Sequence, residues 1–454
     1  MRQDWLGNSV TVESAETLKG IDAFLEGFLS YETKAMEIVA AADGDRDCAI
    51  ANAYAAMLMM FMESPEAPNL ARPYLDRAEA AAPHASRREQ MDIAAIRAWV
   101  DNDMPRAIRL SREIAAEWPH DLAIVKSCQY HAFNLGDAPA MLSIAEPVAK
   151  HNIELPYMHG LLAFAYEQCN LIDEAERAAR RAIALKRKEP WAHHALAHVM
   201  LTQGRTEESR EFMEEMSETW TDLNSFMVTH NWWHLSLNYI GLGQAERALE
   251  LFDREVWGVW KEYSQDQIGA VSLLLRLELA GAQVGDRWAE LADHLAARTQ
   301  DFVQPFLTMQ YLYGLARAGR SEADTLMTNL RGFVAEAPAF VAPAWRQVAL
   351  PACEGLLAHA RGQHPTVLDR LGVALPRMME IGGSHAQRDL FDQVLLDSLI
   401  KTDHRVAAQQ ALEHRRGFDP LDVPTNRALV DIYQALDLPR EAAKAEARVA
   451  QRVS

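Results

Sequence analysis

The sequence predicts an all-α protein, a right-handed α-solenoid built from helix-turn-helix repeats. The chain of 454 residues is rich in Ala, Leu, Glu, Arg and Met, which favour helices. Runs of valine and isoleucine with the period-two alternation of a strand are hard to find. A turn signal between two alanine-rich helical stretches also recurs along the chain at a nearly constant spacing.

The regular part of this pattern lies in the first half of the chain. Turn signals begin at Pro68, Asn102, Gly136, Asn170 and Gly204, which are 34 residues apart four times in succession. A helix-turn-helix period of that length is the tetratricopeptide signature. Gly or Asn permits the left-handed turn that ends the first helix of each pair. Since a single pair cannot bury its apolar face, neighbouring pairs must stack.

The spacing loosens in the second half, where turn signals lie 34 to 43 residues apart. They begin at Gly243, Gly285, Gly319 and Gly362, and further signals lie near Asp403 and Leu438. We therefore expect one α-solenoid domain over residues 1–454. Its parts would be irregular helices over 1–67, regular repeats over about 68–210 and looser repeats over 211–454.

Cysteine usage and the apolar segments indicate a cytoplasmic protein. The four cysteines are far apart and form no CxxC motif, which favours buried free thiols in a reducing compartment. The most apolar stretch, residues 48–62, is shorter than the ~18–20 residues of a spanning helix and contains Asn52. We interpret it as a buried helix. The first twenty residues lack the basic start and apolar core of a secretory signal.

Charge bears on the partners. With 45 basic and 64 acidic residues, the formal net charge is −19, which repels phosphate backbones and argues against nucleic acid. We expect no membrane partner and no cofactor. The expected partner is a small-molecule ligand or substrate. The apolar residues 57–62 can also pack against a second copy, so a homodimer is an alternative to a monomer.

Two histidine pairs are the strongest functional signal. His194 and His198 form one pair, and His230 and His234 form the other. Residues four apart share one face of a helix. The pairs are offset by 36 residues, close to the repeat period, so they occupy equivalent first helices in neighbouring units. Because adjacent helices pack ~8–10 Å apart, the four imidazoles can meet over one ligand.

Three interpretations of the histidines remain open. Their ordinary pKa near ~6.5 suits proton transfer at neutral pH, as in hydrolysis, elimination or isomerisation. Two HxxxH pairs can also supply three or more metal ligands, although the glutamate of an HExxH motif is absent. Alternatively, the imidazoles form hydrogen bonds inside the solenoid and have a structural role only.

The segment GGSHAQRD, residues 382–389, is a second candidate site. Gly382 and Gly383 interrupt a helical pattern and predict a turn, after which Ser384 would cap a new helix. Arg388 could clamp a substrate carboxylate, with Asp389 accepting a proton or orienting the substrate. The alternative is a capped helix whose Arg388 and Asp389 form a salt bridge.

Three more residues complete the candidate pocket. Asp266 and Arg276 lie on roughly one face of an apolar helical stretch, where a charge needs a partner. Asp266 would tune a histidine as a base, or the two would form an internal salt bridge. Adjacent helical residues point about 100° apart, so only one of the two tryptophans at 232 and 233 can face the cavity. We select Trp233.

Several of these segments resemble the tetratricopeptide repeat protein 38 family. They are WAHHALAHVM, THNWWHLSL, GLGQAERALELFD and IGGSHAQRDLFDQVLL. The resemblance implies a helical repeat fold with a family-specific pocket, and it carries no assigned reaction. Relatives tend to have an Asn-Asp-x-His segment where this chain has LTMQ, so Gln310 stands in place of an expected histidine. The matching positions are His194, His198, His230, Asn231, Trp233, His234, Asp266, Arg276, Gly382, Gly383, Ser384, Gln387, Arg388 and Asp389.

Together these signals predict a His/Trp/Arg-lined concave pocket that binds, and acts on, a small polar or anionic molecule by histidine acid–base chemistry. The alternative is a non-catalytic scaffold that binds a peptide or protein partner. The expected catalytic residues are His194, His198, His230, His234, Asp266 and Asp389, and the expected substrate-binding residues are Asn231, Trp233, Arg276, Ser384, Gln387 and Arg388. No metal is expected; a metal, if one binds, would take the four histidines.

Overall fold

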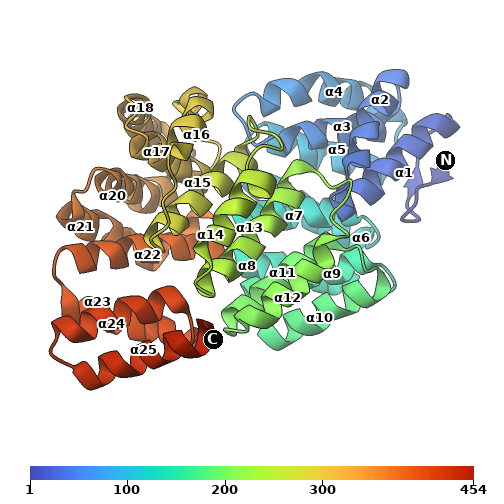
Figure 1. Ribbon diagram of the computed structural model, residues 1–454. Helices are drawn as coiled ribbons and strands as arrows, with labels where there is room; N and C mark the ends of the chain where they lie inside the picture. The colour runs from blue at the N-terminus through green and yellow to red at the C-terminus, as the bar shows by residue number, and fades with distance from the viewer. Residues whose placement is uncertain (454) are drawn as a thin grey trace. The chain divides into compact units, whose positions relative to one another are not determined.

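The computed structural model describes residues 1–453 and consists of helices apart from one small hairpin (Figure 1). The chain divides into two compact units. Unit 1 comprises Met1–Leu196 and Thr219–Met227, and unit 2 comprises Ala197–Glu218 and the chain from Val228 onward. Whether the two units form the single solenoid domain expected from the sequence is not tested by this division, so that expectation stays a prediction.

Unit 1 begins with an antiparallel hairpin, β1 (Arg2–Gln3) and β2 (Ser9–Val10). Residues 219–227 return to this unit, where Leu223 forms an isolated bridge with Glu32. The helices that follow the hairpin are α1 (Ala15–Ser30), η1 (Thr33–Met36), α2 (Glu37–Gly44), α3 (Ala49–Met60), α4 (Ala67–Ala81), η2 (Ala82–His84), α5 (Arg87–Val100), α6 (Met104–Glu117), α7 (Leu122–Asn134), α8 (Ala138–Ala149), α9 (Pro156–Gln168), α10 (Ile172–Leu185) and the start of α11 (Pro190–Thr202).

Unit 2 contains the C-terminal part of α11, α13 from Val228 onward and the remaining helices. In two of its helix pairs, α20 packs closely against α21, and α24 packs closely against α25. The helices are α12 (Thr206–Ser217), α13 (Ser225–Gly241), α14 (Ala245–Leu251), η3 (Phe252–Val256), α15 (Ser264–Leu279), α16 (Arg287–Leu295), η4 (Ala296–Arg298), α17 (Pro305–Arg317), α18 (Glu322–Glu336), α19 (Ala342–Ala344), η5 (Trp345–Ala349), α20 (Leu350–Ala360), α21 (His364–Ala374), η6 (Leu375–Ile381), α22 (His385–Lys401), α23 (Arg405–Phe418), α24 (Val423–Ala435) and α25 (Pro439–Val453).

The predicted left-handed turns are present. Asn102, Gly136, Asn170 and Gly204 have φ of 59°, 71°, 59° and 67°, and each follows the first helix of a pair. The looser signals behave in the same way, from Gly243 (φ 76°) onward. The predicted fold class, an all-α protein of tetratricopeptide-like helix-turn-helix repeats, is therefore confirmed.

One turn signal lies inside a helix. Pro68 falls in the first turn of α4, which begins at Ala67. A proline is tolerated there because the first backbone N–H groups of a helix have no partner within that helix. The left-handed residue before α4 is Glu63, with φ 48°. The 34-residue spacing from Asn102 thus leads to the start of a helix rather than to the turn before it.

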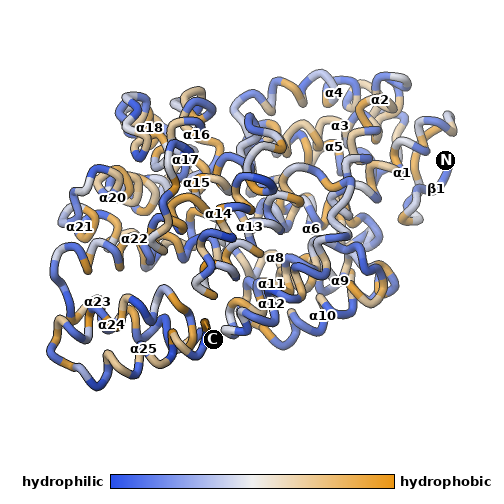
Figure 2. Tube along the Cα trace, viewed as in Figure 1, coloured by the Kyte–Doolittle hydropathy of each residue, from blue (hydrophilic) through white to orange (hydrophobic). Residues whose placement is uncertain are grey.

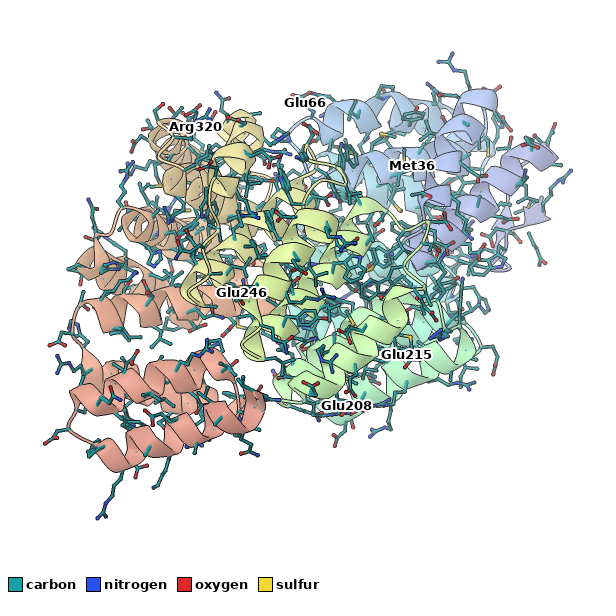
Figure 3. All side chains as sticks on the ribbon, viewed as in Figure 1. Met36, Glu66, Glu208, Glu215, Glu246 and Arg320 are labelled. Carbon is teal, nitrogen blue, oxygen red and sulfur yellow. The ribbon has the colours of Figure 1, made fainter. Side chains whose placement is uncertain are left out.

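The helices carry both apolar and polar residues along their length, as the hydropathy colours show (Figure 2). In α10 the buried face consists of alanines, which let the neighbouring helix α9 approach closely. Polar side chains of unit 2 point into solvent: Glu208, Glu215 and Glu246 extend from the ribbon (Figure 3), and all three are exposed.

Three of the four cysteines and most of the apolar stretch 48–62 are buried, as the sequence predicted. Cys48, Cys128 and Cys353 are buried free thiols, whereas Cys169 is half-buried. Burial raises the pKa of Cys48 to about 11. The apolar stretch 48–62 forms α3, which is buried through Met57. Within residues 1–453, no helix is both long enough and apolar enough to cross a membrane.

Candidate functional site

Three of the four predicted histidines meet in unit 2. His198 lies on α11, and His230 and His234 lie on α13. The ring centroids of His198 and His234 are 4.5 Å apart, and those of His230 and His234 are 4.8 Å apart. His385, the first residue of α22, brings a further imidazole to within 5.7 Å of His198. The histidine motif and the GGSHAQRD segment therefore share one site.

His194 lies in unit 1, where it packs among aromatic side chains. Its ring stacks on Trp191 at 4.4 Å between centroids and lies 5.1 Å from the ring of Phe164. The prediction that all four imidazoles converge over one ligand joins residues of both units, and it stays a prediction. The same holds for metal binding by the four histidines.

Trp233 organises the histidine cluster. It is 1% exposed, its indole is parallel to the ring of His230 at 5.3 Å, and it meets His234 edge-on at 4.8 Å. The guanidinium of Arg276 lies 5.2 Å from the centre of the indole, within the range of a cation–π interaction. The indole Nε1 is buried without a hydrogen-bond partner among the described residues.

Arg276 joins α15 to the N-terminal end of α22. Its guanidinium donates to the carbonyl of Ala386 at 2.7 Å, to that of Gln387 at 3.3 Å and to the hydroxyl of Ser272 at 2.5 Å. Burial lowers its pKa to about 10, against the attraction of Asp389. These contacts hold α22 in place, which is a positioning role; the substrate-binding role predicted from the sequence stays a prediction.

The predicted turn and cap at the start of α22 are present. Gly382 and Gly383 have φ of 82° and 75°. The Ser384 hydroxyl accepts from the backbone N–H of Gln387 at 3.2 Å, and the Gln387 side chain accepts from the backbone N–H of Ser384 at 2.8 Å. This capping box satisfies two amides of the helix N-terminus, so Ser384 and Gln387 are committed to the helix start.

The salt bridge of this segment differs from the predicted pair. Asp389 binds Arg415 of α23 at 2.5 Å and accepts from Gln393 at 2.7 Å, while Arg388 donates to the carbonyl of Gly383. Burial disfavours ionisation of Asp389, but Arg415 outweighs it and lowers the pKa of Asp389 to about 2. Neighbouring residues on a helix point in different directions, so the Arg388–Asp389 alternative was wrong.

Asp266 and Asn231 lie close to the histidines. Asp266 accepts from the Thr229 hydroxyl at 3.3 Å and from the backbone N–H of Trp260 at 3.1 Å. Thr229 directly precedes His230 on α13, and Asn231 beside it is fully buried. Gln310, which replaces an expected histidine, is also buried, and its Nε2 has no partner among the described residues. The predicted roles of Asp266 and Asn231 stay predictions.

Acidification is expected to destabilise unit 2 through His230. Protein surrounds most of this partly exposed ring, and burial, with a smaller effect of His198, lowers its pKa from 6.5 to about 3. The folded-state pKa lies below the unfolded value, so this stabilisation is present above pH 6.5 and is lost as the pH falls toward 3.

The measurement is the free energy of urea unfolding at pH 7 and pH 5, for the natural chain and for His230→Asn. The natural chain should lose about 1–2 kcal/mol more than the variant, because each pH unit in this window costs about 1.4 kcal/mol per proton bound. Equal losses in the two proteins would show that His230 is not held neutral by the fold.

A second feature of unit 2, a cavity of about 930 Å³, was not predicted from the sequence. Its walls come from α15, α16, α17, α22 and the turn between α20 and α21. Two ion pairs lie on the walls, Glu278 with Arg317 at 2.6 Å and Asp397 with Lys401 at 2.9 Å. Trp288 contributes a buried Nε1 that has no hydrogen-bond partner within the described part of the chain.

Two residues of the histidine site were also missed. His385 stands inside the GGSHAQRD motif, and counting it with the other histidines would have identified it. Arg415 lies 26 residues after its partner Asp389, in a stretch that looks like any exposed helix. No local pattern distinguishes Arg415, because only the packing of α22 on α23 brings the pair together.

No known protein-family model matches the chain. A solved structure of a human IFIT1 dimer with PPP-AAAA is similar over 99% of this chain and 97% of its own, at 12% identity and a TM-score of 0.40. A structure of Naa15/Naa10 bound to HypK-THB is similar over 81% of this chain and 64% of its own, at 13% identity and a TM-score of 0.25. At identities this low, the similarity concerns the helical fold alone.

The predicted partners need correction. We expected a small molecule and excluded nucleic acid, but the two solved helical chains are described with PPP-AAAA and with proteins bound. Neither supports a small-molecule partner, and an acidic chain is no ground for excluding nucleic acid. The physical error was to use the net charge, because the local potential decides what a surface attracts. Lys186, Arg187 and Lys188, for example, are consecutive basic residues in unit 1.

Proposed function

We propose that this protein is a non-catalytic helical-repeat scaffold that binds an extended peptide segment of a protein partner in the cavity of unit 2. The observation that carries the proposal is the origin of the cavity walls. They come from the ends of six helices, α15, α16, α17, α20, α21 and α22. Repeat proteins use such surfaces, to which many units contribute, to bind other chains.

The chemistry of the walls suits a peptide backbone. Both ion pairs on the walls are partly solvated, with Arg317 and Lys401 side chains 40% and 52% exposed. Pairs of this kind contribute only about 0–1 kcal/mol to stability, so they can open toward a new partner. The unpartnered Nε1 of Trp288 is a donor that a peptide carbonyl can satisfy.

The contacts of the predicted catalytic residues also favour a scaffold. His230 is held neutral with a pKa of about 3, which makes it a weak base at neutral pH. Arg276 binds backbone carbonyls of α22, and Asp389 is fixed by Arg415. Each of these side chains already contributes to the packing of unit 2.

The test is a selection of random displayed peptides on the full chain, followed by fluorescence anisotropy with the best peptide. We expect one peptide per chain and a Kd weakened about tenfold, about 1.4 kcal/mol, by Trp288→Phe, which keeps an aromatic side chain and removes the N–H donor. Arg317→Ala should have a similar effect. Arg247→Ala is the control, because Arg247 is an exposed arginine of α14 paired with Glu250.

Circular dichroism melting would establish that each variant folds. If selection yields no saturable peptide, the scaffold proposal fails. If Trp288→Phe and Arg317→Ala both bind as tightly as Arg247→Ala, the cavity is not the binding surface.

We further propose that the chain is a cytoplasmic member of the tetratricopeptide repeat protein 38 family. The support is the pair of segments HNWWH and GGSHAQRD, which a generic tetratricopeptide repeat does not contain. The neighbouring positions of His234, His198 and His385 agree with a shared family pocket at these two segments. A fluorescent fusion of the full chain, imaged in cells, would test the location.

A further inference from the structure

Two histidines and an aspartate form a cluster on the wall of the unit 2 cavity. His359 lies in the last turn of α20, His364 begins α21, and Asp397 lies near the end of α22. Gly362, with φ 69°, makes the tight turn that returns the chain between the two histidines. Their rings are 5.6 Å apart between centroids, at an interplanar angle of 80°.

We propose that His359, His364 and Asp397 bind a divalent transition-metal ion, for which Zn²⁺ is the probe. One donor atom from each residue lies within 4.8 Å of the other two. Zinc needs nitrogen and oxygen donors ~2.0–2.2 Å from the ion, hence about 3.4 Å from one another in a tetrahedron. Small side-chain rotations therefore close the site. The cavity leaves the fourth position open to water.

Each histidine is oriented by a second hydrogen bond. His364 Nδ1 lies 3.1 Å from the hydroxyl of Ser398, and His359 Nδ1 lies 3.1 Å from the hydroxyl of Tyr313. If both Nδ1 atoms carry the proton and donate, both Nε2 atoms present a lone pair. Metal-binding histidines are usually held by such a partner on the other ring nitrogen.

Lys401 competes with the ion. Its ammonium lies 2.9 Å from Asp397 Oδ2, and the His359 Nε2 also lies 2.9 Å from that oxygen. Lys401 is the last residue of α22, and its side chain is 52% exposed, so it can move into solvent. Metal binding would replace this cation at the carboxylate. A purely structural His359–Asp397–Lys401 network predicts no effect of metal on the protein.

The test uses metal alone, on protein purified without an affinity tag. Calorimetric titration with Zn²⁺, and visible absorption of bound Co²⁺, should give one ion per chain. His364→Gln and Asp397→Asn should each weaken binding at least about tenfold. Lys401→Ala should tighten it, because the competing cation is removed. His414→Gln, a change of an exposed histidine on α23 whose ring meets Phe418 edge-on, should leave binding unchanged.

Ser398→Ala separates binding from folding, since Ser398 is not a ligand. Loss of its hydrogen bond should weaken binding about 10–100-fold while the far-ultraviolet circular dichroism stays the same. Persistent binding by a combined His364→Gln, Asp397→Asn variant would overturn the proposal. So would the absence of saturable binding by both the natural chain and Lys401→Ala. No peptide takes part, so the outcome is independent of the scaffold proposal.

Discussion

Replacing Arg88 with methionine is expected to destabilise unit 1 by about 3–5 kcal/mol, because the buried carboxyl groups of Asp92 and Asp121 lose the arginine that binds both. Arg88 binds Asp92 at 3.0 Å and Asp121 at 2.5 Å, and the three side chains are 3%, 0% and 1% exposed. Burial, together with the neighbouring charge of Asp121, raises the pKa of Asp92 well above its ordinary value. Arg88 also donates to the carbonyl of Ser9, which fastens the N-terminal hairpin.

The adjacent residue provides a matched control. Arg87 pairs with Glu117 at 2.8 Å, but the two side chains are 70% and 43% exposed. An exposed pair contributes about 0–1 kcal/mol, so Arg87→Met should be nearly neutral. Urea unfolding of both variants would measure the difference. If the two substitutions cost the same, the buried arginine is not what compensates the carboxylates.

Gly204→Ala is expected to destabilise unit 2 by about 2–5 kcal/mol, the sum of two effects. Its φ of 67° costs an L-residue about 1–2 kcal/mol. An added Cβ would also collide with the backbone carbonyl of Phe418, and such overpacking costs about 1–3 kcal/mol more. The turn after α11 and the loop after α23 are joined here by a hydrogen bond from Thr206 to Asp419.

Gly319→Ala isolates the conformational part of this effect. Gly319 has a similar φ of 70°, and an added Cβ would meet nothing within 4 Å. Thermal or urea unfolding should therefore show a loss of only about 1–2 kcal/mol. Asn102 and Asn170 adopt the same conformation, so a side chain is tolerated at these turns where space allows. If Gly319→Ala lowered the free energy of unfolding as much as Gly204→Ala does, the collision with Phe418 would not contribute to the cost.

The repeat could be predicted from the sequence because its cause is local. A residue that tolerates positive φ ends each first helix, and this requirement recurs wherever a pair must turn, as at Gly136 and Gly362. The cap of α22 was predictable for the same reason, since Ser384 and Gln387 satisfy amides within their own first turn. The start of α4 at Ala67 was misplaced because a proline is compatible with a helix start as well as a turn.

The candidate site was predictable only in part. The four-residue spacing of His230 and His234 places both on one face of α13, and their rings are neighbours. The partner of Asp389 could not be predicted, because Arg415 reaches it only through the packing of α23 on α22. The His359–His364–Asp397 cluster was missed because its residues belong to three helices and match no compact motif.

The sequence by itself determined the helices, the turns between them and the residues that share a helix face, because these depend on interactions within a few positions of the chain. The tertiary structure alone decided which charges pair and which walls form a cavity. It placed Arg276 against α22 and gave unit 2 a polar cavity with a histidine–aspartate cluster on its wall. Those contacts depend on the small rotation between stacked helix pairs, which no local pattern encodes.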